Sequence, residues 1–241
     1  SQLTSLVQAI IKAFSPASRP PLSGSSAGSD LAETWAAQAL TWAVHGQSWH
    51  ITGRSFQIYR ALRPAITRDA QNDLLECLLR SMSTKTGNKR KSHTKSGPMQ
   101  TRENLALTIE VLITLQTLVR AQSAQKLILF PQMFWTSVAL LHTDYEQHYL
   151  ASLKLLSDLL DRLDLSDRYV QNIFSASIPK EWDPPFRGIQ HLVARGLFSS
   201  ATESKAIDVL TKLVLIPFDQ ILHPDPGRLF HTIICLLPFV L

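Results

Sequence analysis

The stretch TDYEQHYLASLKLLSDLLDRL, residues 143–163, contains the pattern that decides the fold class. Its apolar side chains recur at steps of four, three, four and three: Tyr149, Leu153, Leu156, Leu160 and Leu163. The polar positions between them are Lys154, Ser157, Asp158, Asp161 and Arg162. Because an α-helix turns once in about 3.6 residues, this spacing separates an apolar face from a polar one. The stretch therefore predicts an amphipathic helix of about five turns with one buried face.

Signals for helix starts recur along the chain. Thr143 followed by Glu146 has the spacing of a capping box, in which each side chain bonds a backbone N–H that the helix leaves unpaired. Ser200 followed by Glu203 repeats this spacing. Pro131 is expected in the first turn of another helix, where its missing N–H costs nothing.

Helical spacing continues almost everywhere, and no run alternates with period two for long enough to predict a strand. We expect eleven helices, near 2–14, 31–45, 48–63, 67–82, 102–121, 131–142, 144–163, 166–175, 187–197, 201–215 and 226–240. The helix at 102–121 is apolar on two sides, so it needs neighbours on both. Helix pairs spaced by roughly 40 residues are typical of HEAT and armadillo repeats. The predicted fold class is all-α, an α-α superhelix that forms a HEAT/armadillo-like solenoid fragment.

Two polar, irregular segments divide the chain. SPASRPPLSGSSAGSD, residues 15–30, is rich in serine, proline and glycine, and STKTGNKRKSHTKSGPMQ, residues 83–100, is rich in lysine and serine. Such compositions do not bury enough apolar surface to fold alone. We expect an N-terminal helix at 1–14, a flexible linker at 15–30, and a helical-repeat region at 31–241 with a disordered basic insertion at about 83–100.

The net charge of +5 comes from 24 lysines and arginines against 19 acidic residues. Five of the cations lie in the second polar segment, without an acid among them: Lys85, Lys89, Arg90, Lys91 and Lys95. The rest of the chain thus balances 19 basic against 19 acidic residues. A nucleic-acid groove needs cations spread over a folded face with aromatic platforms nearby, so no nucleic-acid partner is predicted.

Each of the two cysteines, Cys77 and Cys235, is followed by a leucine, which favours small buried side chains in a reducing, intracellular compartment. The first residues, SQLTSLVQAI, lack a signal pattern, and the last are apolar, so we expect a piece of a longer protein. The longest apolar stretch, LALTIEVLITLQTLV, is interrupted by Glu110 and Gln116. It is expected to be too short and too interrupted to be an integral membrane segment.

No pattern of a catalytic or metal centre is present in the sequence. There is no HExxH and no G-x-S-x-G, and the glycines of SGSSAGSD lack the lysine of a phosphate loop. His142 and His148 do not share a helical face, and Asp144 with His148 lacks a third ligand. The series Asp158, Asp161, Asp164 and Asp167 is interpreted as a solvated helix face and the cap that follows it. We expect no enzyme, no metal and no cofactor.

The stretch HITGRSFQIYRAL, residues 50–62, gathers polar groups that could belong to a site. On a helix, Phe56, Tyr59 and Leu62 share one side, and the small residue Gly53 suggests close contact with another helix. We therefore favour a packed helix with a buried or stacked Arg54 over a ligand site.

Three tryptophans, Trp35, Trp42 and Trp49, recur every seven residues. Trp49 is expected to begin a new helix because Gly46 and Ser48 interrupt the segment before it. Packing in a core or an interface is preferred here to a peptide-binding groove.

Four motifs in order give the chain a family resemblance. They are GRSFQIYRAL (53–62), FPQMFWTSVALLHT (130–143), LKLLSDLLDRLDLSD (153–167) and FRGIQHLVARGLFSSATESKAIDVLTKL (186–213). Together they resemble the C-terminal conserved region of the Furry family of cell-morphogenesis scaffold proteins, and we expect a fungal member. The resemblance covers about 31 to the end of the chain and leaves out 15–30 and 83–100.

The resemblance implies a non-catalytic scaffold built of HEAT/armadillo-like repeats. Such a scaffold is expected to act with an NDR-family kinase and its Mob coactivator, and with other parts of the same long chain, in cell polarity and polarised growth. The implied location is the cytoplasm, enriched at the cell cortex or sites of polarised growth. The family transfers no site residues.

Several charged residues remain possible partner contacts: Arg54, Arg60, Asp158, Asp161, Lys89, Arg90 and Lys91. Two other functions stay open from the residues alone, namely an α-helical enzyme with a site assembled from distant residues and a helical module that binds cargo or lipid. A deep polar pocket with perturbed titration would favour the enzyme, and a long apolar or charged groove would favour the scaffold.

Overall fold

A computed structural model describes residues 2–14, 27–46, 48–83, 98–182, 186, 188–216, 230 and 234. Within these ranges the chain forms eleven α-helices and no strand, which confirms the all-α class. The chain divides into two compact units, residues 1–121 and 122–241. The superhelical arrangement predicted from the sequence stays a prediction.

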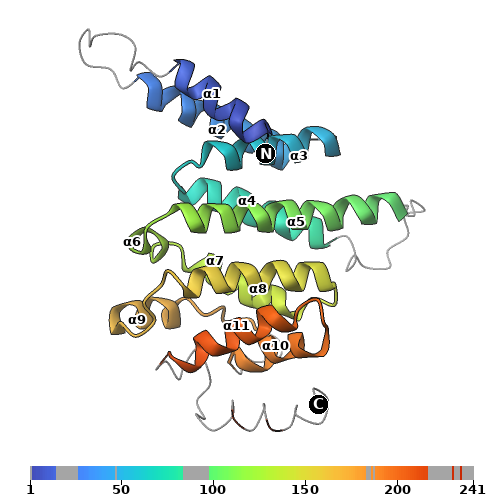
Figure 1. Ribbon diagram of the computed structural model, residues 1–241, viewed down its shortest axis with the longest axis vertical. Coiled ribbons are helices and arrows are strands. Elements are labelled where there is room, and N and C mark those ends of the chain that lie inside the picture. Colours follow the sequence, from blue (N-terminus) through green and yellow to red (C-terminus); the bar gives the residue numbers. More distant parts are fainter. Residues whose placement is uncertain are drawn as a thin grey trace. The chain divides into compact units, whose positions relative to one another are not determined.

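The first unit contains the helices α1 (Gln2–Phe14), α2 (Ala27–His45), α3 (Trp49–Leu62), α4 (Arg68–Ser83) and α5 (Pro98–Ala121). Within it, α1, α2 and α3 contact one another, and α4 pairs with α5 (Figure 1). The two groups join where α2 meets α4 and α3 meets α5. The helix pairs expected from the periodicity are therefore present in this unit.

The core of the first unit is apolar. It contains the fully buried side chains of Phe56, Leu74, Val111 and Leu115. Both apolar sides predicted for the helix at 102–121 are buried in the C-terminal half of α5, as a two-sided helix requires. By length and composition, Arg102–Ala121 is long enough to cross a membrane, contrary to the sequence-based expectation. This segment nevertheless packs against α3 and α4, as a core helix does.

Backbone geometry fixes both ends of α3. At Gly46, a Cβ atom would lie 2.5 Å from the carbonyl oxygen of Trp42, so the turn from α2 into α3 accepts no side chain there. Trp49 begins α3, as predicted. At the other end, Arg63 has a φ of 48°, a left-handed conformation that ends the helix before Pro64.

The second unit contains α6 (Ala124–Leu127), α7 (Pro131–Ala139), η2 (Leu140–His142), α8 (Glu146–Leu160), α9 (Arg168–Ala176), α10 (Gln190–Ala194), η3 (Arg195–Phe198) and α11 (Glu203–Val214). Here α8 packs between α7 and α11, and α10 and η3 also contact α11 (Figure 1). The whole apolar face predicted from residues 143–163 is buried. Trp135 of α7 donates a hydrogen bond to the Phe174 carbonyl of α9 at 3.2 Å, which joins these helices.

The two predicted capping boxes are wrong. The helix α8 begins after Tyr145, and Thr143 instead accepts a bond from the Tyr145 N–H at 3.3 Å. At α11 the residue before the helix is Thr202, whose hydroxyl bonds the Gly196 carbonyl at 2.7 Å. The residues predicted as N-caps, Thr143 and Ser200, both lie before the observed N-cap residues Tyr145 and Thr202. The spacing alone therefore placed the start of each helix too early.

Other helix starts follow the sequence more closely. Pro131 occupies the first turn of α7, and Asp167 caps α9 by accepting a bond from the Tyr169 N–H at 2.8 Å. The helices α2 and α5 begin four residues earlier than predicted, so 27–30 of the expected linker and 98–100 of the expected insertion are helical. Ser83, the first residue of the expected insertion, ends α4. Residues 15–26 and 84–97, and nearly all of the helix predicted at 226–240, lie outside the described residues.

Candidate contact surfaces

The predicted contact residues Arg54 and Arg60 lie together on an open groove between α1 and α3. The groove has a volume of about 800 Å³, and α1 contributes Gln2, Leu3 and Leu6 to it. Leu6 is 57% exposed, so an apolar side chain stands beside the two guanidinium groups. A groove that combines an apolar wall with cations suits the side chains of an acidic protein segment.

The two arginines differ in their bonding. Arg60 donates to the Glu110 carboxylate of α5 at 2.7 Å and to the Thr114 hydroxyl at 3.0 Å, with both charged side chains mostly buried. Arg54 is exposed and bonds only its helix neighbour Gln57, at 2.9 Å, among the interactions described. The expectation of a buried Arg54 is therefore wrong; Arg60 is the arginine that holds helices together.

Asp161 lies where the end of α8 meets α11, and Asp158 is half-buried on α8. Lys212 of α11 donates to the Asp161 carboxylate at 2.7 Å and to the Ser157 hydroxyl at 2.6 Å. Ser157, expected on the solvated face, is 2% exposed. The polar side of α8 thus contacts another helix, and reversing the charge of Asp161 would remove a bond within the fold.

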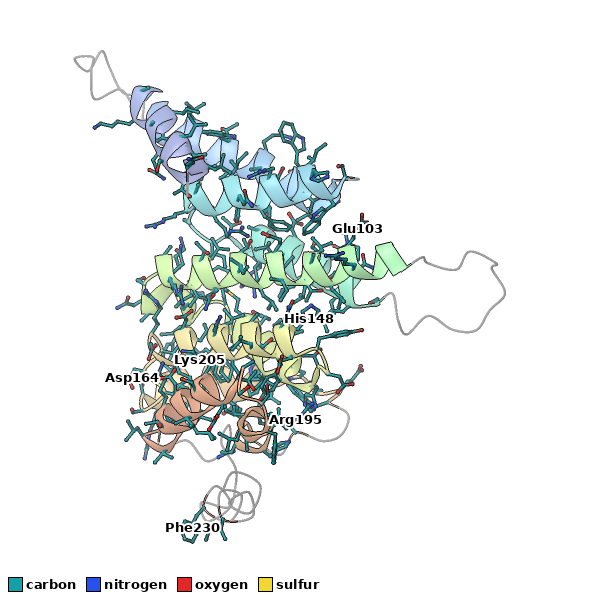
Figure 2. The ribbon with its side chains drawn as sticks, turned by 45° about the vertical axis from the view of Figure 1, so that its right-hand side comes forward. Glu103, His148, Asp164, Arg195, Lys205 and Phe230 are labelled. Atoms are coloured by element: carbon teal, nitrogen blue, oxygen red, sulfur yellow. The ribbon has the colours of Figure 1, made fainter. Side chains whose placement is uncertain are left out.

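A second carboxylate completes this contact. Asp208 accepts bonds from Ser157 at 2.8 Å and from Lys205 at 2.9 Å, and Lys205 lies on α11 beside α8 in Figure 2. Burial raises the pKa of Asp208, but the bonds from Lys205 and Ser157 and the charge of Lys212 outweigh it and lower the pKa to about 2. The carboxylate is therefore ionised at neutral pH and fixes α11 on α8.

The basic candidates Lys89, Arg90 and Lys91 lie outside the described residues. Whether they and the four charged residues above contact a partner stays a prediction. Of the tryptophans, Trp42 is 55% exposed and is not part of a core within the described ranges, whereas Trp35 and Trp49 are half-buried.

One recess in the second unit gathers polar and titratable groups. Arg195, labelled in Figure 2, lies 3.6 Å from the carboxylate of Asp144 and donates to the Leu141 carbonyl at 3.1 Å. Tyr149 donates to the Leu192 carbonyl at 2.7 Å, and burial raises its pKa to about 12. The recess holds about 130 Å³, below the several hundred Å³ of common ligand pockets. Its polar groups serve chiefly to join α8, η3 and the preceding turns.

Among the described residues there is no group of three or more histidine, cysteine, aspartate or glutamate side chains that could hold a metal ion. Cys77 is buried, and burial raises the pKa of its thiol although the neighbouring Arg80 lowers it. This agrees with the interpretation of Cys77 as a packing residue; Cys235 lies outside the described residues.

An acidic cavity between α2 and α4 was not predicted from the sequence. Its volume is about 420 Å³, and its charged lining residues are Glu33, Asp69 and Asp73. Tyr59, predicted to be a packing residue, also lines it. Asp69 and Asp73 are one helical turn apart and could have been paired from sequence, whereas Glu33 joins them only because α2 packs on α4.

Comparison with known proteins gives these surfaces a context. Residues 131–241 match a model of the C-terminal region of cell morphogenesis proteins, and residues 24–89 match a model of their central region. The chain is 30% identical to the cell morphogenesis protein PAG1 of Saccharomyces cerevisiae over 213 residues, 87% of the chain. The chain belongs to the Furry family of cell-morphogenesis proteins.

A second relative in the Furry family is the cell polarity protein mor2 of Schizosaccharomyces pombe, 26% identical over 194 residues, 80% of the chain. The chain spans 8% of the length of each of these two fungal relatives. No solved structure matches it. The family resemblance is confirmed, but the first motif, at 53–62, lies in the part of the chain that matches the central region and not the C-terminal one. The chain corresponds to a small part of a large morphogenesis protein.

Proposed function

We propose that this region is a non-catalytic scaffold segment of a large cell-polarity protein, acting in morphogenesis together with an NDR-family kinase and its Mob coactivator. Its place is the cytoplasm, enriched at the cell cortex or sites of polarised growth. The observation that carries the proposal is the match to fungal morphogenesis and polarity proteins along most of the chain.

The geometry of the first unit supports a role in binding proteins. The α1–α3 groove is open and combines Leu6 with the exposed Arg54, as protein contact surfaces do at their polar rims. Helix pairs such as α2–α3 and α4–α5 are also the building block of helical-repeat scaffolds. We propose that these pairs continue as a HEAT/armadillo-like superhelix through the longer protein.

The proposed scaffold role is tested in the native full-length protein. Residues 1–241 are replaced by a flexible linker, and cell shape, kinase association and kinase activity are each measured. The proposal predicts misshapen cells with reduced kinase association. Normal morphology together with normal kinase association would overturn it.

A point variant tests whether the α1–α3 groove binds a partner without a change in the stability of the fold. Arg54→Glu reverses an exposed charge, so it should weaken partner capture while leaving the melting temperature of the chain unchanged. Lys154→Glu, an exposed reversal on α8, is the matched control and should leave capture intact. Equal loss with both variants would point to net charge and not to the groove.

A further inference from the structure

The acidic cavity of the first unit has apolar walls. Ala36 and Leu40 of α2 are buried and form one side, while Pro64 after α3 and Ala70 of α4 form the other. All these elements belong to one compact unit. A space of about 420 Å³ is large enough for one long side chain and the backbone that presents it.

The charged residues that line this cavity are all acidic, and two of the three, Glu33 and Asp69, are exposed. Glu33, Asp69 and Asp73 line it, and none of its lining residues is a lysine, arginine or histidine. Within the described ranges, no ion pair is found for these three carboxylates, whereas Glu110, Asp161 and Asp208 elsewhere in the chain are each paired. Unpaired like charges on apolar walls attract a cation.

A tyrosine side chain in the wall of the same cavity offers its hydroxyl to a ligand. Tyr59 is 2% exposed and lines the cavity, yet its hydroxyl has no hydrogen-bond partner within the part of the chain that the structure describes. Tyr149, the comparable buried tyrosine of the second unit, does bond a carbonyl. Burial and the nearby Asp73 carboxylate raise the pKa of Tyr59 to about 12, so it stays neutral. A neutral hydroxyl accepts a bond from a cationic N–H.

We propose that the cavity between α2 and α4 binds a lysine or arginine side chain presented by a basic segment of a protein partner. The apolar stem lies along Leu40 and Ala36, and the charged head lies among the carboxylates and the Tyr59 hydroxyl. This inference rests on the proposed scaffold function for its choice of a protein as the source of the cation.

The chemistry of the lining favours such a side chain over other cations. A bare metal ion prefers several oxygen ligands close together, and no such group is found among the described residues. A lysine or arginine instead needs both the apolar walls and the distributed acidic rim.

The direct test is fluorescence anisotropy with the full 241-residue chain and a labelled arginine-rich peptide. A peptide with citrulline in place of arginine is the matched neutral probe. We expect salt-sensitive binding of the arginine peptide, at least about tenfold tighter than that of the citrulline peptide. Equal binding of both peptides would overturn the proposal.

Three variants locate the binding. Glu33→Gln and Asp73→Asn should each weaken binding by about tenfold, and Tyr59→Phe by a few-fold, because each removes one partner of the cationic head. Glu76→Gln is the control, since Glu76 is exposed on the same helix as Asp73 but does not line the cavity. A similar loss with Glu76→Gln would overturn the proposal.

Two further measurements test the stability of the cavity and its selectivity among cations. The melting temperatures of Glu33→Gln and Asp73→Asn should equal or exceed that of the parent chain, because the variants relieve like-charge repulsion; a large drop would overturn the assignment of a site. Spermidine and Ca²⁺ are titrated as competitors, and displacement of the peptide by either at equal concentration would show a cation site that is not specific for a protein.

The peptide assay and the replacement of residues 1–241 in the full-length protein together separate this inference from the scaffold function. If the peptide does not bind but replacing residues 1–241 still distorts the cells, only the cavity assignment fails. If the peptide binds as expected but the replacement leaves the cells normal, the scaffold function fails and the cation site stands.

Discussion

Gly53 and Gly196 differ in the space that each leaves for a side chain. The sequence suggested close packing at Gly53, yet a Cβ atom there would have no neighbour within 4 Å. At Gly196, a Cβ atom would lie 2.8 Å from the Ala206 Cβ and 3.0 Å from the Tyr149 ring. The close approach is therefore at the η3–α11 contact, where sequence spacing gave no signal.

Gly196→Ala should lower the free energy of unfolding by about 1–3 kcal/mol, because the new methyl group overpacks the contact with α11. Gly53→Ala should raise it by up to about 1 kcal/mol, because alanine favours the helix and meets no atom. Urea unfolding of both variants checks the pair, and the same sign for both changes would contradict the geometry.

At the scale of elements, the bond between Arg60 and Glu110 fixes α3 on α5. Arg60→Met should cost about 2–4 kcal/mol of unfolding free energy, because it leaves Glu110, only 19% exposed, without its cation. Adding Glu110→Leu should recover most of the loss, since no unpaired charge then remains. Arg54→Met, on the exposed side of α3, is the control and should change stability by less than about 0.5 kcal/mol.

The contact of α8 with α11 should depend on pH. The folded pKa of Asp208, about 2, lies below its unfolded value of about 4, so the unfolded chain binds the proton more tightly. Its stabilising contribution is therefore complete above about pH 4 and is lost as the pH falls towards 2. Melting temperatures between pH 7 and 2 should fall less steeply in Asp208→Asn, which lacks this group. An identical pH profile would contradict the role assigned to Asp208.

At the scale of the molecule, the two compact units each depend on their own apolar core. Leu156 is fully buried in the second unit, so Leu156→Asp should abolish the cooperative melting of residues 122–241 by placing an unpaired charge in that core. Circular dichroism melting of the full chain measures this loss. Lys154→Asp, exposed on the same helix, should melt as the parent does. Unchanged melting of Leu156→Asp would contradict the burial.

The sequence by itself determined the helical class, the buried face of α8, the start of α3 at Trp49 and the family. These features depend on residues close together along the chain, because side-chain periodicity and the order of motifs are local properties. Arg54 and Arg60 were also selected from sequence, because both stand in the motif GRSFQIYRAL.

Only the tertiary structure decided which polar faces meet. Ser157 is buried because Lys212 and Asp208 of α11 pack over it, and Glu33 joins Asp73 because α2 packs on α4. The same holds for the contribution of α1 to the groove that contains Arg54. These pairings join positions far apart in the chain, so they follow from how the helices pack against one another, which the spacing within any one helix does not specify.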